Sequence, residues 1–519
     1  MRNLFLLTLL LFSGAVSAAF DPATCAQTNI RCIGDGMEYD TDNGTGDDSP
    51  IFQTAINASA PGDTIVLRGG TYNHAVSSSN LYFAEVDVSG TAQNPIVITG
   101  AEDETAHIVG FGYPEDGSDP GREDEEIFRV NGDYIHFKDF EISYSSRFGI
   151  TLNGNHGLVE NMYIHDNWHD GVTIGRTGTA VTGNTVRYSE FHNMRHGSGV
   201  ILSRGSNDTN PISYSLVEYN ISYNNGYMPN GQKVPAVTGD VAGGGNSDGF
   251  GVTKNCNDVA AAGENNCPNN TYQYNIAWHN ADDGFDFSFG GGSKVVGNIS
   301  FNNGPEGNRG FKVLRNVSGG LTFIGNISIN NVHPSSRGLE LRFNESGNMF
   351  HNIAMREGAH GLYVSATVPS GIRVHNNIEF DNGNGPAITS GVTNTNNSTS
   401  VTPQITNTNF QYADINTNPS ASTILERRNL IFNQVKNALL PTVGSPLIDA
   451  GLFLSDIHCA TADDDATTPH DPNDSSCRHW MGSAPDIGPF EYGLDTAGAE
   501  PSTSPPKVPT SINLILVGN

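Results

Sequence analysis

Positive charge is scarce in this chain. Its 519 residues include 26 lysines and arginines against 55 aspartates and glutamates, which gives a formal net charge of −29 at pH 7. Proteins that bind nucleic acid or anionic membranes need a basic surface, so this balance argues against both partners. An anionic polysaccharide would also be repelled unless bound cations or arginines offset the field locally. We attribute the charge mainly to solubility outside the cell.

Long apolar runs are also missing from the body of the chain. Near the start, Arg2 precedes the apolar run Leu4–Phe12, and the small residues Val16, Ser17 and Ala18 follow. This pattern is typical of a secretory signal peptide, which we place at residues 1–18. The run is too short to span a bilayer. We therefore expect a secreted protein, extracellular or periplasmic, that acts as a monomer.

Cysteine is sparse, and no Cys-x-x-Cys spacing occurs. The six cysteines form three close pairs: Cys25/Cys32, Cys256/Cys267 and Cys459/Cys477. This spacing disfavours a zinc cluster, and in an oxidising compartment it favours three short disulfide loops. Connectivity cannot be proved from the sequence.

Glycine is abundant, with 60 residues, and asparagine recurs in a repeated phrase. Asn-Ile followed by Ser, Ala or Glu occurs at intervals of 55, 23, 28, 26 and 25 residues: Asn220, Asn275, Asn298, Asn326, Asn352 and Asn377. Because the first interval is about twice the others, either one phrase is skipped or an insertion intervenes. Units this short fit three strands joined by turns and not a helix pair. We predict an all-β fold, a right-handed parallel β-helix with asparagine ladders at its turns.

The N-terminal end of the repeat has the pattern of a cap. Ser49 as N-cap and Pro50 at the first helical position predict a short helix over residues 49–57, and a strand follows Gly62. Such a helix would protect the open end of the sheets from edge pairing. We expect one β-helix domain over residues 19–493, followed by a linker and tail rich in Pro, Ser and Thr over residues 494–519.

A second column of the repeat consists of a glycine followed by an apolar residue: Gly149, Gly171, Gly199, Gly249, Gly284, Gly310, Gly338 and Gly361. Matching positions on neighbouring coils would lie about 4.8 Å apart. Two places after glycine, Asp286 and Lys312 should then be neighbours on the outer surface. Asp248 and Asp283, one place before glycine, would face the same way only if the chain bends at glycine, which we assume.

Four aspartates fall in two consecutive acidic units: Asp248, Asp282, Asp283 and Asp286. Carboxylates this close would repel one another without a cation, and a flexible set of oxygen ligands favours calcium. A solvated acidic turn is the alternative, because Asp-Gly is a common turn dipeptide. The coincidence of four aspartates favours the metal.

Lys312 has two interpretations. It could form a surface ion pair with Asp286, which would contribute little. It could instead be a general base, although lysine ordinarily keeps its proton up to a pKa of about 10.4. Nearby calcium and Arg309 would favour the neutral amine, and the carboxylates would oppose it. We therefore expect activity to rise into the alkaline range.

The phrases Ser247–Phe250, Asp282–Asp286 and Gly310–Lys312, in this order on a β-helix, resemble the family 9 polysaccharide lyases, whose founding activity is pectate lyase. The resemblance is tight over these units and covers most of residues 130–390 as a repeat pattern. It implies that the four aspartates hold calcium and that Lys312 abstracts a proton. The long segment between Asp248 and Asp282 departs from the family, and we expect a disulfide-pinned loop there.

The implied reaction is β-elimination on a uronate polysaccharide, with pectate as the first expectation. Arginines on the following turns are candidates to bind further carboxylates in paired hydrogen bonds, although each could pair with the acidic surface instead: Arg309, Arg315, Arg337 and Arg342. Three alternatives stay open. An inverting polygalacturonan hydrolase would need two carboxyl groups and no lysine base. The others are a lyase acting on alginate or another uronate glycan, and a non-catalytic sugar-binding β-helix.

Histidines form another offset pattern. His165 and His169 lie in one repeat and His192 and His196 in the next, each pair shifted by 27 residues. Stacked imidazoles could bind a transition metal. Ladder positions at a turn explain the same spacing, and we favour that interpretation.

Overall fold

The computed structural model describes residues 22–39, 46–75, 81–112, 125–176, 178–204, 210–228, 230–235, 247–253, 256, 267–289, 291–304, 309–316, 320–331, 333–343, 346–366, 371–398, 415–439, 445–448, 450–452 and 454. The predicted signal peptide, the Cys459/Cys477 pair and the predicted tail lie outside these residues. Those expectations, and the domain limits drawn from them, stay predictions.

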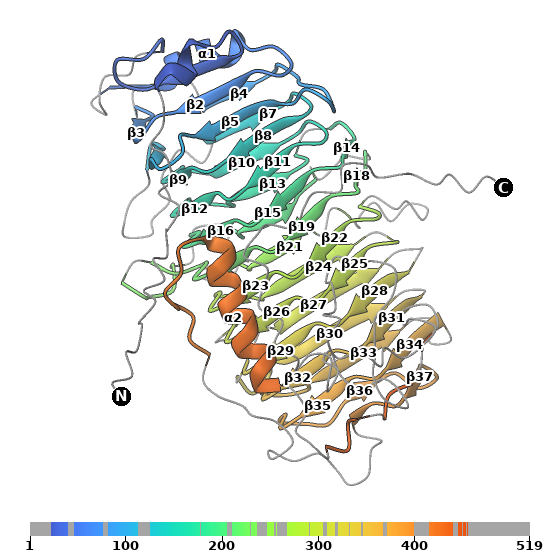
Figure 1. The fold of residues 1–519 in the computed structure, drawn as a ribbon. Helices are drawn as coiled ribbons and strands as arrows, with labels where there is room; N and C mark the ends of the chain where they lie inside the picture. The colour runs from blue at the N-terminus through green and yellow to red at the C-terminus, as the bar shows by residue number, and fades with distance from the viewer. Residues whose placement is uncertain are drawn as a thin grey trace, which may run out of the picture.

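Short parallel strands stack into three long sheets, here called A, B and C (Figure 1). Sheet A contains β1 Ile30–Ile33, β2 Thr64–Leu67, β5 Ile96–Gly100, β8 Ile135–Lys138, β11 Leu158–Glu160, β15 Thr185–Arg187, β19 Leu216–Glu218, β22 Thr271–Gln273, β25 Lys294–Val296, β28 Leu321–Ile324, β31 Gly347–Phe350, β34 Ile372–His375 and β37 Thr393–Thr395. Sheet B contains β3 Gly70–Asn73, β6 Ala106–Val109, β9 Glu141–Ser143, β12 Tyr163–His165, β16 Glu190–His192, β20 Ile221–Tyr223, β23 Ile276–Trp278, β26 Ile299–Phe301, β29 Ile327–Ile329, β32 Ile353–Met355 and β35 Ile378–Phe380. Sheet C contains β4 Tyr82–Val86, β7 Glu126–Val130, β10 Phe148–Leu152, β13 Val172–Ile174, β17 Val200–Leu202, β21 Phe250–Val252, β24 Phe285–Phe289, β27 Arg309–Asn316, β30 Arg337–Phe343, β33 Leu362–Ala366 and β36 Ala387–Ile388. A small pair joins β14 Val181–Thr182 to β18 Ile212–Ser213, and a short 3₁₀ helix η1 spans Pro22–Ala26.

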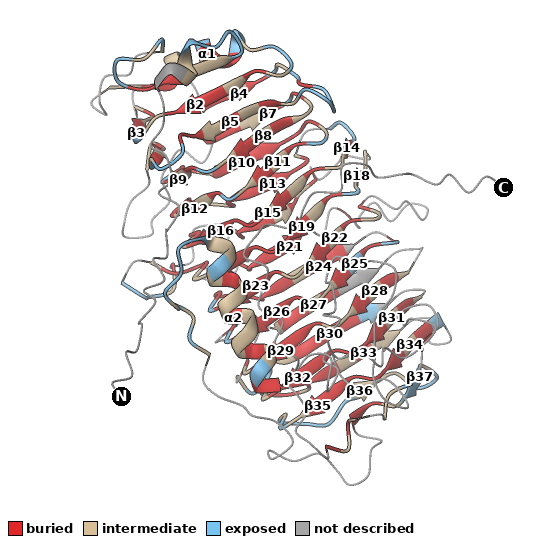
Figure 2. Cartoon of the chain, in the orientation of Figure 1, coloured by how far each residue is buried: buried red, intermediate tan, exposed pale blue. Residues whose placement is uncertain are grey.

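Each coil of the chain adds one strand to each of the three sheets. The order C, A, B repeats from β10, β11 and β12 onward, and every strand pairs in parallel with its neighbour one coil away. Figure 2 shows the strands largely buried along the whole stack. The apolar residues after the glycines point inward, so the ring of Phe285 stacks at 5.1 Å on Phe250 and at 4.5 Å on Phe311. The predicted right-handed parallel β-helix is confirmed.

The repeated asparagines form a ladder along one turn of the coil. In each step, the backbone N–H and the side-chain amide of one asparagine donate to the side-chain oxygen of the next, at 2.8–3.1 Å: Asn220, Asn275, Asn298, Asn326, Asn352, Asn377 and Asn397. Asn220 bonds directly to Asn275, so the 55-residue interval contains an insertion and no missing phrase. Buried amides need such partners, which explains why asparagine recurs.

The helix α1 Ser49–Asn57 covers the N-terminal end of the stack, as predicted (Figure 1). Phe52 is fully buried and packs edge-on against Tyr72 and Phe83 at 5.2 and 4.6 Å. One detail of the prediction was wrong. Asp48 occupies the N-cap position, and Ser49 is already the first helical residue.

A second helix, α2 Ile424–Leu439, was not predicted from the sequence. It lies across the outer face of sheet B (Figure 1), where Ile431, Val435 and Leu439 join an apolar cluster with Trp278 and Phe301. The four-residue spacing of these three apolar residues marks one face of a helix, and this signal was present in the sequence. Within the described chain, neither α1 nor α2 is long and apolar enough to cross a membrane.

Two of the three expected disulfides are present. Cys25 bonds to Cys32 and Cys256 bonds to Cys267. The second disulfide closes the segment inserted between β21 and β22, which is where a pinned loop was expected.

Candidate active site

Strands β21, β24 and β27 of sheet C carry the acidic and basic residues singled out from the sequence. Their register pairs Gly251 with Asp286 and Asp286 with Lys312. The same column continues to Glu340 and then to Tyr363. The alignment on glycines is therefore confirmed, and Asp286 and Lys312 lie one strand spacing apart, about 4.8 Å.

The glycines of this column are required by close passage of the backbone. A Cβ on Gly310 would lie 2.9 Å from the backbone oxygen of Gly338 and 1.9 Å from the hydroxyl of Ser328. A Cβ on Gly284 would lie 2.8 Å from the backbone oxygen of Gly310 and 2.2 Å from the hydroxyl of Ser300. A side chain at either glycine would force the neighbouring coil to shift. Asp283 before glycine and Asp286 after it bring carboxylate oxygens within 4.8 Å of each other, as the assumed bend at glycine requires.

Three of the four predicted aspartates form one group. Asp248, Asp283 and Asp286 each offer a carboxylate oxygen, and these oxygens lie within 4.8 Å of one another. The backbone N–H of Asp283 donates to Oδ1 of Asp248 at 3.0 Å, which ties the two coils together. Asp248 and Asp283 are buried, and Asp286 is half-buried. A set made only of oxygen donors, crowded and shielded from water, has the chemistry that hard divalent cations require.

The pKa values of Asp248 and Asp286 are raised by their surroundings. Burial first, and then the charges of Asp282 and Asp286, raise the pKa of Asp248 well above its ordinary range. Burial and the charge of Asp283 raise the pKa of Asp286 to about 6, although Lys312 opposes the shift. Burial is thus the largest cause of both shifts, and the neighbouring carboxylates add to it.

Asp282, the fourth predicted ligand, is not part of this close group. It is buried, and burial together with the charge of Asp283 raises the pKa of its carboxyl to about 7. Asp282 thus adds to the negative potential of the site. Its role as a ligand stays a prediction.

Lys312 bridges two of the aspartates. Its Nζ donates to Oδ2 of Asp283 at 2.8 Å and to Oδ2 of Asp286 at 2.7 Å. Burial alone would lower the pKa of this ammonium group, but the carboxylates, Asp283 first, outweigh that effect and raise the pKa. The ion pair with Asp286 considered from the sequence is therefore present, and Asp283 shares it. Among the side-chain contacts of the described residues, Lys312 is the charged group that binds the aspartate oxygens directly.

Three of the four predicted arginines converge on one buried carboxylate. Glu340 is fully buried and accepts from Arg309 at 2.5 Å, from Arg337 at 2.7 Å and from Arg342 at 2.6 Å. Burial would raise the pKa of Glu340, but the guanidinium groups, Arg309 first, lower it. Three cations on one anion leave an excess of positive charge one strand away from Lys312. The side chain of Arg315 lies outside the described residues.

The histidine pattern forms a ladder on sheet B, on a different face from the aspartates. The rings of His165 and His192 stack at 4.8 Å with 3° between their planes. His165 is hydrogen-bonded to Asp166 and Glu141, both at 2.8 Å. Although burial opposes it, these carboxylates raise the pKa of His165 to about 9. A charged imidazole held at both nitrogens fits the ladder interpretation. In the other pair, His169 and His196 contact Phe148 and Trp168, respectively.

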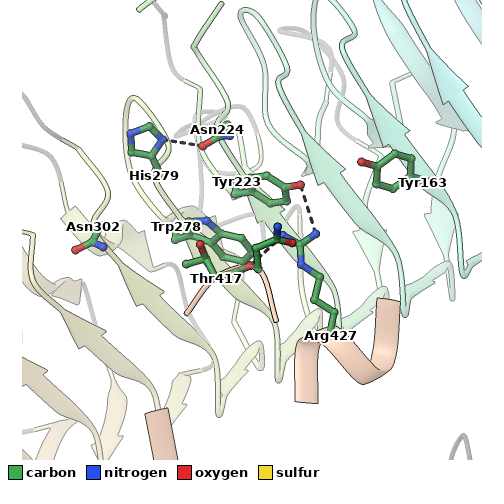
Figure 3. Close-up of a pocket in the computed structure, with 9 residues that line it drawn as sticks. Tyr163, Tyr223, Asn224, Trp278, His279, Asn302, Thr417 and Arg427 are labelled. Carbon is green, nitrogen blue, oxygen red and sulfur yellow. Dashed lines mark hydrogen bonds between the residues drawn. The ribbon is translucent and has the colours of Figure 1, made fainter. Parts of the chain in front are cut away.

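A cavity of about 570 Å³ lies away from the aspartates, where sheet B meets the start of α2 (Figure 3). Its lining consists of Tyr163, Tyr223, Asn224, Trp278, His279, Asn302, Thr417, Asn418 and Arg427. Arg427 reaches across it and donates to the backbone oxygen of Thr417 at 3.0 Å. The sequence did not indicate this cavity, because its two walls come together only when α2 packs on sheet B.

The chain matches a family described as "Pel9A-like, right handed beta helix region" over residues 36–397, which is more than half of its length. Similarity to characterised proteins is shorter. Pectate lyase L of Dickeya chrysanthemi is 28% identical over 160 residues, which cover 30% of this chain and 37% of that protein. Pectate lyase L of Paenibacillus polymyxa (strain SC2) is 29% identical over 125 residues, 24% of this chain and 26% of that protein. The chain therefore matches between about a quarter and little more than a third of the length of these relatives.

Solved structures give the following similarities. The crystal structure of pectate lyase Pel9A is 20% identical, covers 85% of this chain and 90% of that chain, and has a TM-score of 0.48. The crystal structure of alginate lyase from Paenibacillus sp. str. FPU-7 is 16% identical, covers 66% of this chain and 97% of that chain, and has a TM-score of 0.41.

Proposed function

The chain belongs to the Pel9A-like right-handed β-helix family, and from this premise we propose that it is a secreted, calcium-dependent polysaccharide lyase. Its substrate in this proposal is a uronate polysaccharide, and pectate is the first choice. The observation that carries the proposal is the contact of Lys312 with Asp283 and Asp286 on the outer face of sheet C. The proposed base Lys312 therefore lies one strand spacing from Asp286, which is one of the proposed metal ligands.

The aspartate group supports the calcium part of the proposal. Asp248, Asp283 and Asp286 supply oxygen donors close to one another. Burial first, and then the neighbouring carboxylates, raise the pKa of Asp248 and of Asp286. Asp282 completes the proposed set. Calcium held there would bind the uronate carboxylate, stabilise the charge that builds on it and so acidify the hydrogen at C5. The aspartates themselves orient the sugar by fixing where its carboxylate can lie.

Lys312 is the proposed base. It takes the proton from C5, the electron pair left behind forms the C4–C5 double bond, and the C4 glycosidic oxygen leaves with the electrons of the broken bond. In the contacts described above Lys312 is protonated, since the carboxylates raise its pKa. It must therefore lose that proton before each turnover, which supports the expectation that activity rises with pH.

The cluster around Glu340 is the proposed holder of a neighbouring uronate. Arg309 and Arg337 are partly exposed and Arg342 is exposed, and the three arginines outnumber the single carboxylate that they share. Guanidinium donors left over from that pairing suit a second carboxylate in a bidentate contact. Glu340 would fix the arginines in place and limit the cost of ordering them.

Incubation with polygalacturonate, alginate and chondroitin sulfate, with and without calcium, tests the proposal. A lyase releases an ultraviolet-absorbing unsaturated uronide, and we expect it from polygalacturonate in calcium. Reducing ends without this absorbance would point to a hydrolase, and retention of the polymer without cleavage would point to a binding protein. Absorbance from alginate or chondroitin sulfate alone would keep the reaction and change the substrate.

A further inference from the structure

Two arginines on the outer face of sheet C lie together beside one phenylalanine ring. Arg147 comes just before β10, and Arg176 comes just after β13. Their guanidinium groups lie over the ring of Phe148, at 4.9 and 4.4 Å from its centroid. Both side chains are half-buried, and no described residue gives either guanidinium a hydrogen bond or an ion pair.

This pair differs from the neighbouring arginines. Arg129, on the adjacent strand β7, bonds to Glu126 at 2.8 and 3.1 Å, and the arginines beyond Lys312 share Glu340. Burial first, and then the charge of Arg147, lower the pKa of Arg176, although the charges of Asp170 and Glu126 oppose this shift. Two like charges beside one ring repel, and the attraction of the ring for cations offsets this in part. An anion between them would relieve the repulsion and use their free donors.

The arginine pair and the aspartates lie along the same sheet, sheet C. Phe148 occupies the column that Asp248 and Asp283 occupy further along sheet C, one place before glycine. The strand order from β10 to β24 runs through β13, β17 and β21. Phe148 lies three strand spacings from the coil of Asp248 and four from Asp286, on the order of 14 and 19 Å. Between the two sites, the column of Phe148 carries Asp170 and Ser198, and the column two places after glycine carries Thr173, Ile201 and Gly251.

We propose that Arg147 and Arg176 form a distal subsite that binds a carboxylate of the anionic polysaccharide several sugar residues away from the reacting one. The inference rests on the proposed function, because the ligand of this subsite is the polysaccharide substrate proposed above. The polysaccharide would then run across the strands of sheet C, from this pair over the aspartates to the arginines around Glu340. Because contacts lie on both sides of the reacting bond, the protein would cleave long chains at internal positions.

Kinetics on chains of different length test the subsite. The variant carrying Arg147→Gln and Arg176→Gln is compared with Arg373→Gln, whose guanidinium lies 5.0 Å from the ring of Phe350 on sheet A. Loss of a charge-assisted contact should lower kcat/KM on polygalacturonate by about tenfold in the double variant. The loss should shrink as the substrate is shortened to a trimer, while Arg373→Gln should behave as the wild type. An equal loss at every length, or no loss on the polymer, would overturn the subsite.

Binding measurements separate this proposal from the proposed function. Retention of polygalacturonate in native affinity gels, and calorimetry with inorganic phosphate, need no catalysis. If the wild type eliminates no uronate yet the double variant retains the polymer less, the lyase proposal fails and the subsite stands. If elimination occurs and neither retention nor kinetics responds to the arginines, the subsite fails alone. Binding of phosphate without any effect on the polymer would also overturn it, since the pair would then be a site for small anions only.

Discussion

Replacing Glu357 by glutamine is expected to stabilise the protein at alkaline pH and to leave it nearly unchanged in acid. Glu357 is fully buried and accepts from the hydroxyl of Ser328 at 2.8 Å and from the amide of Asn331 at 3.0 and 3.2 Å. It takes the place that Asn280 and Asn303 hold in a second asparagine ladder on earlier coils. Burial raises the pKa of this carboxyl to about 8.

The size of the effect follows from proton linkage. The folded state holds the Glu357 proton more tightly than the unfolded chain, whose carboxyl has an ordinary pKa of 4.5. The stability linked to this group is therefore complete below pH 4.5 and is lost as the pH rises toward about 8. At about 1.4 kcal/mol per pKa unit, the loss amounts to about 5 kcal/mol above that pH. Glutamine cannot ionise, and it can turn its oxygen to Asn331 and its amide to Ser328, whose hydroxyl also accepts.

Urea unfolding of wild type and Glu357→Gln between pH 4 and pH 9.5 measures this effect. We expect the free energy of unfolding of the wild type to fall relative to the variant across that range. Glu102→Gln, which removes a carboxylate from an exposed side chain, is the matched control and should follow the wild type. Parallel curves for wild type and Glu357→Gln would mean that the buried carboxyl is ionised when folded, and the reasoning would be refuted.

Four further outcomes are expected. Lys312→Met should abolish the unsaturated product while circular dichroism stays unchanged, and residual activity near the wild-type level would remove Lys312 as the base. Exhaustive chelation should abolish the lyase activity of the wild type and added calcium should restore it, and activity that survives chelation would exclude the metal. Asp283→Asn should weaken calcium binding in calorimetry, because this carboxylate lies between Asp248 and Lys312. Gly310→Ala should destabilise the protein by about 1–3 kcal/mol in urea, because its Cβ would lie 1.9 Å from a neighbouring hydroxyl. A neutral result there would show that the coils can move apart.

The sequence by itself determined which residues lie one above another. In a parallel β coil, equivalent positions of successive repeats pair directly, so the glycine spacing was enough to place Asp286 beside Lys312. The asparagine ladder follows for the same reason, because a buried amide must find its partner on the next coil. The capping helix and two disulfides could also be predicted from the sequence, because each depends on residues close together in the chain.

Only the tertiary structure decided where side chains from different coils and different parts of the chain meet. Column order could not show that Arg309, Arg337 and Arg342 share Glu340, or that Asp282 lies outside the close group of aspartates. These outcomes depend on how far each side chain reaches once the backbone bends at glycine. The packing of α2 on sheet B and the meeting of two arginines over one phenylalanine ring depend in the same way on contacts that local pattern does not encode.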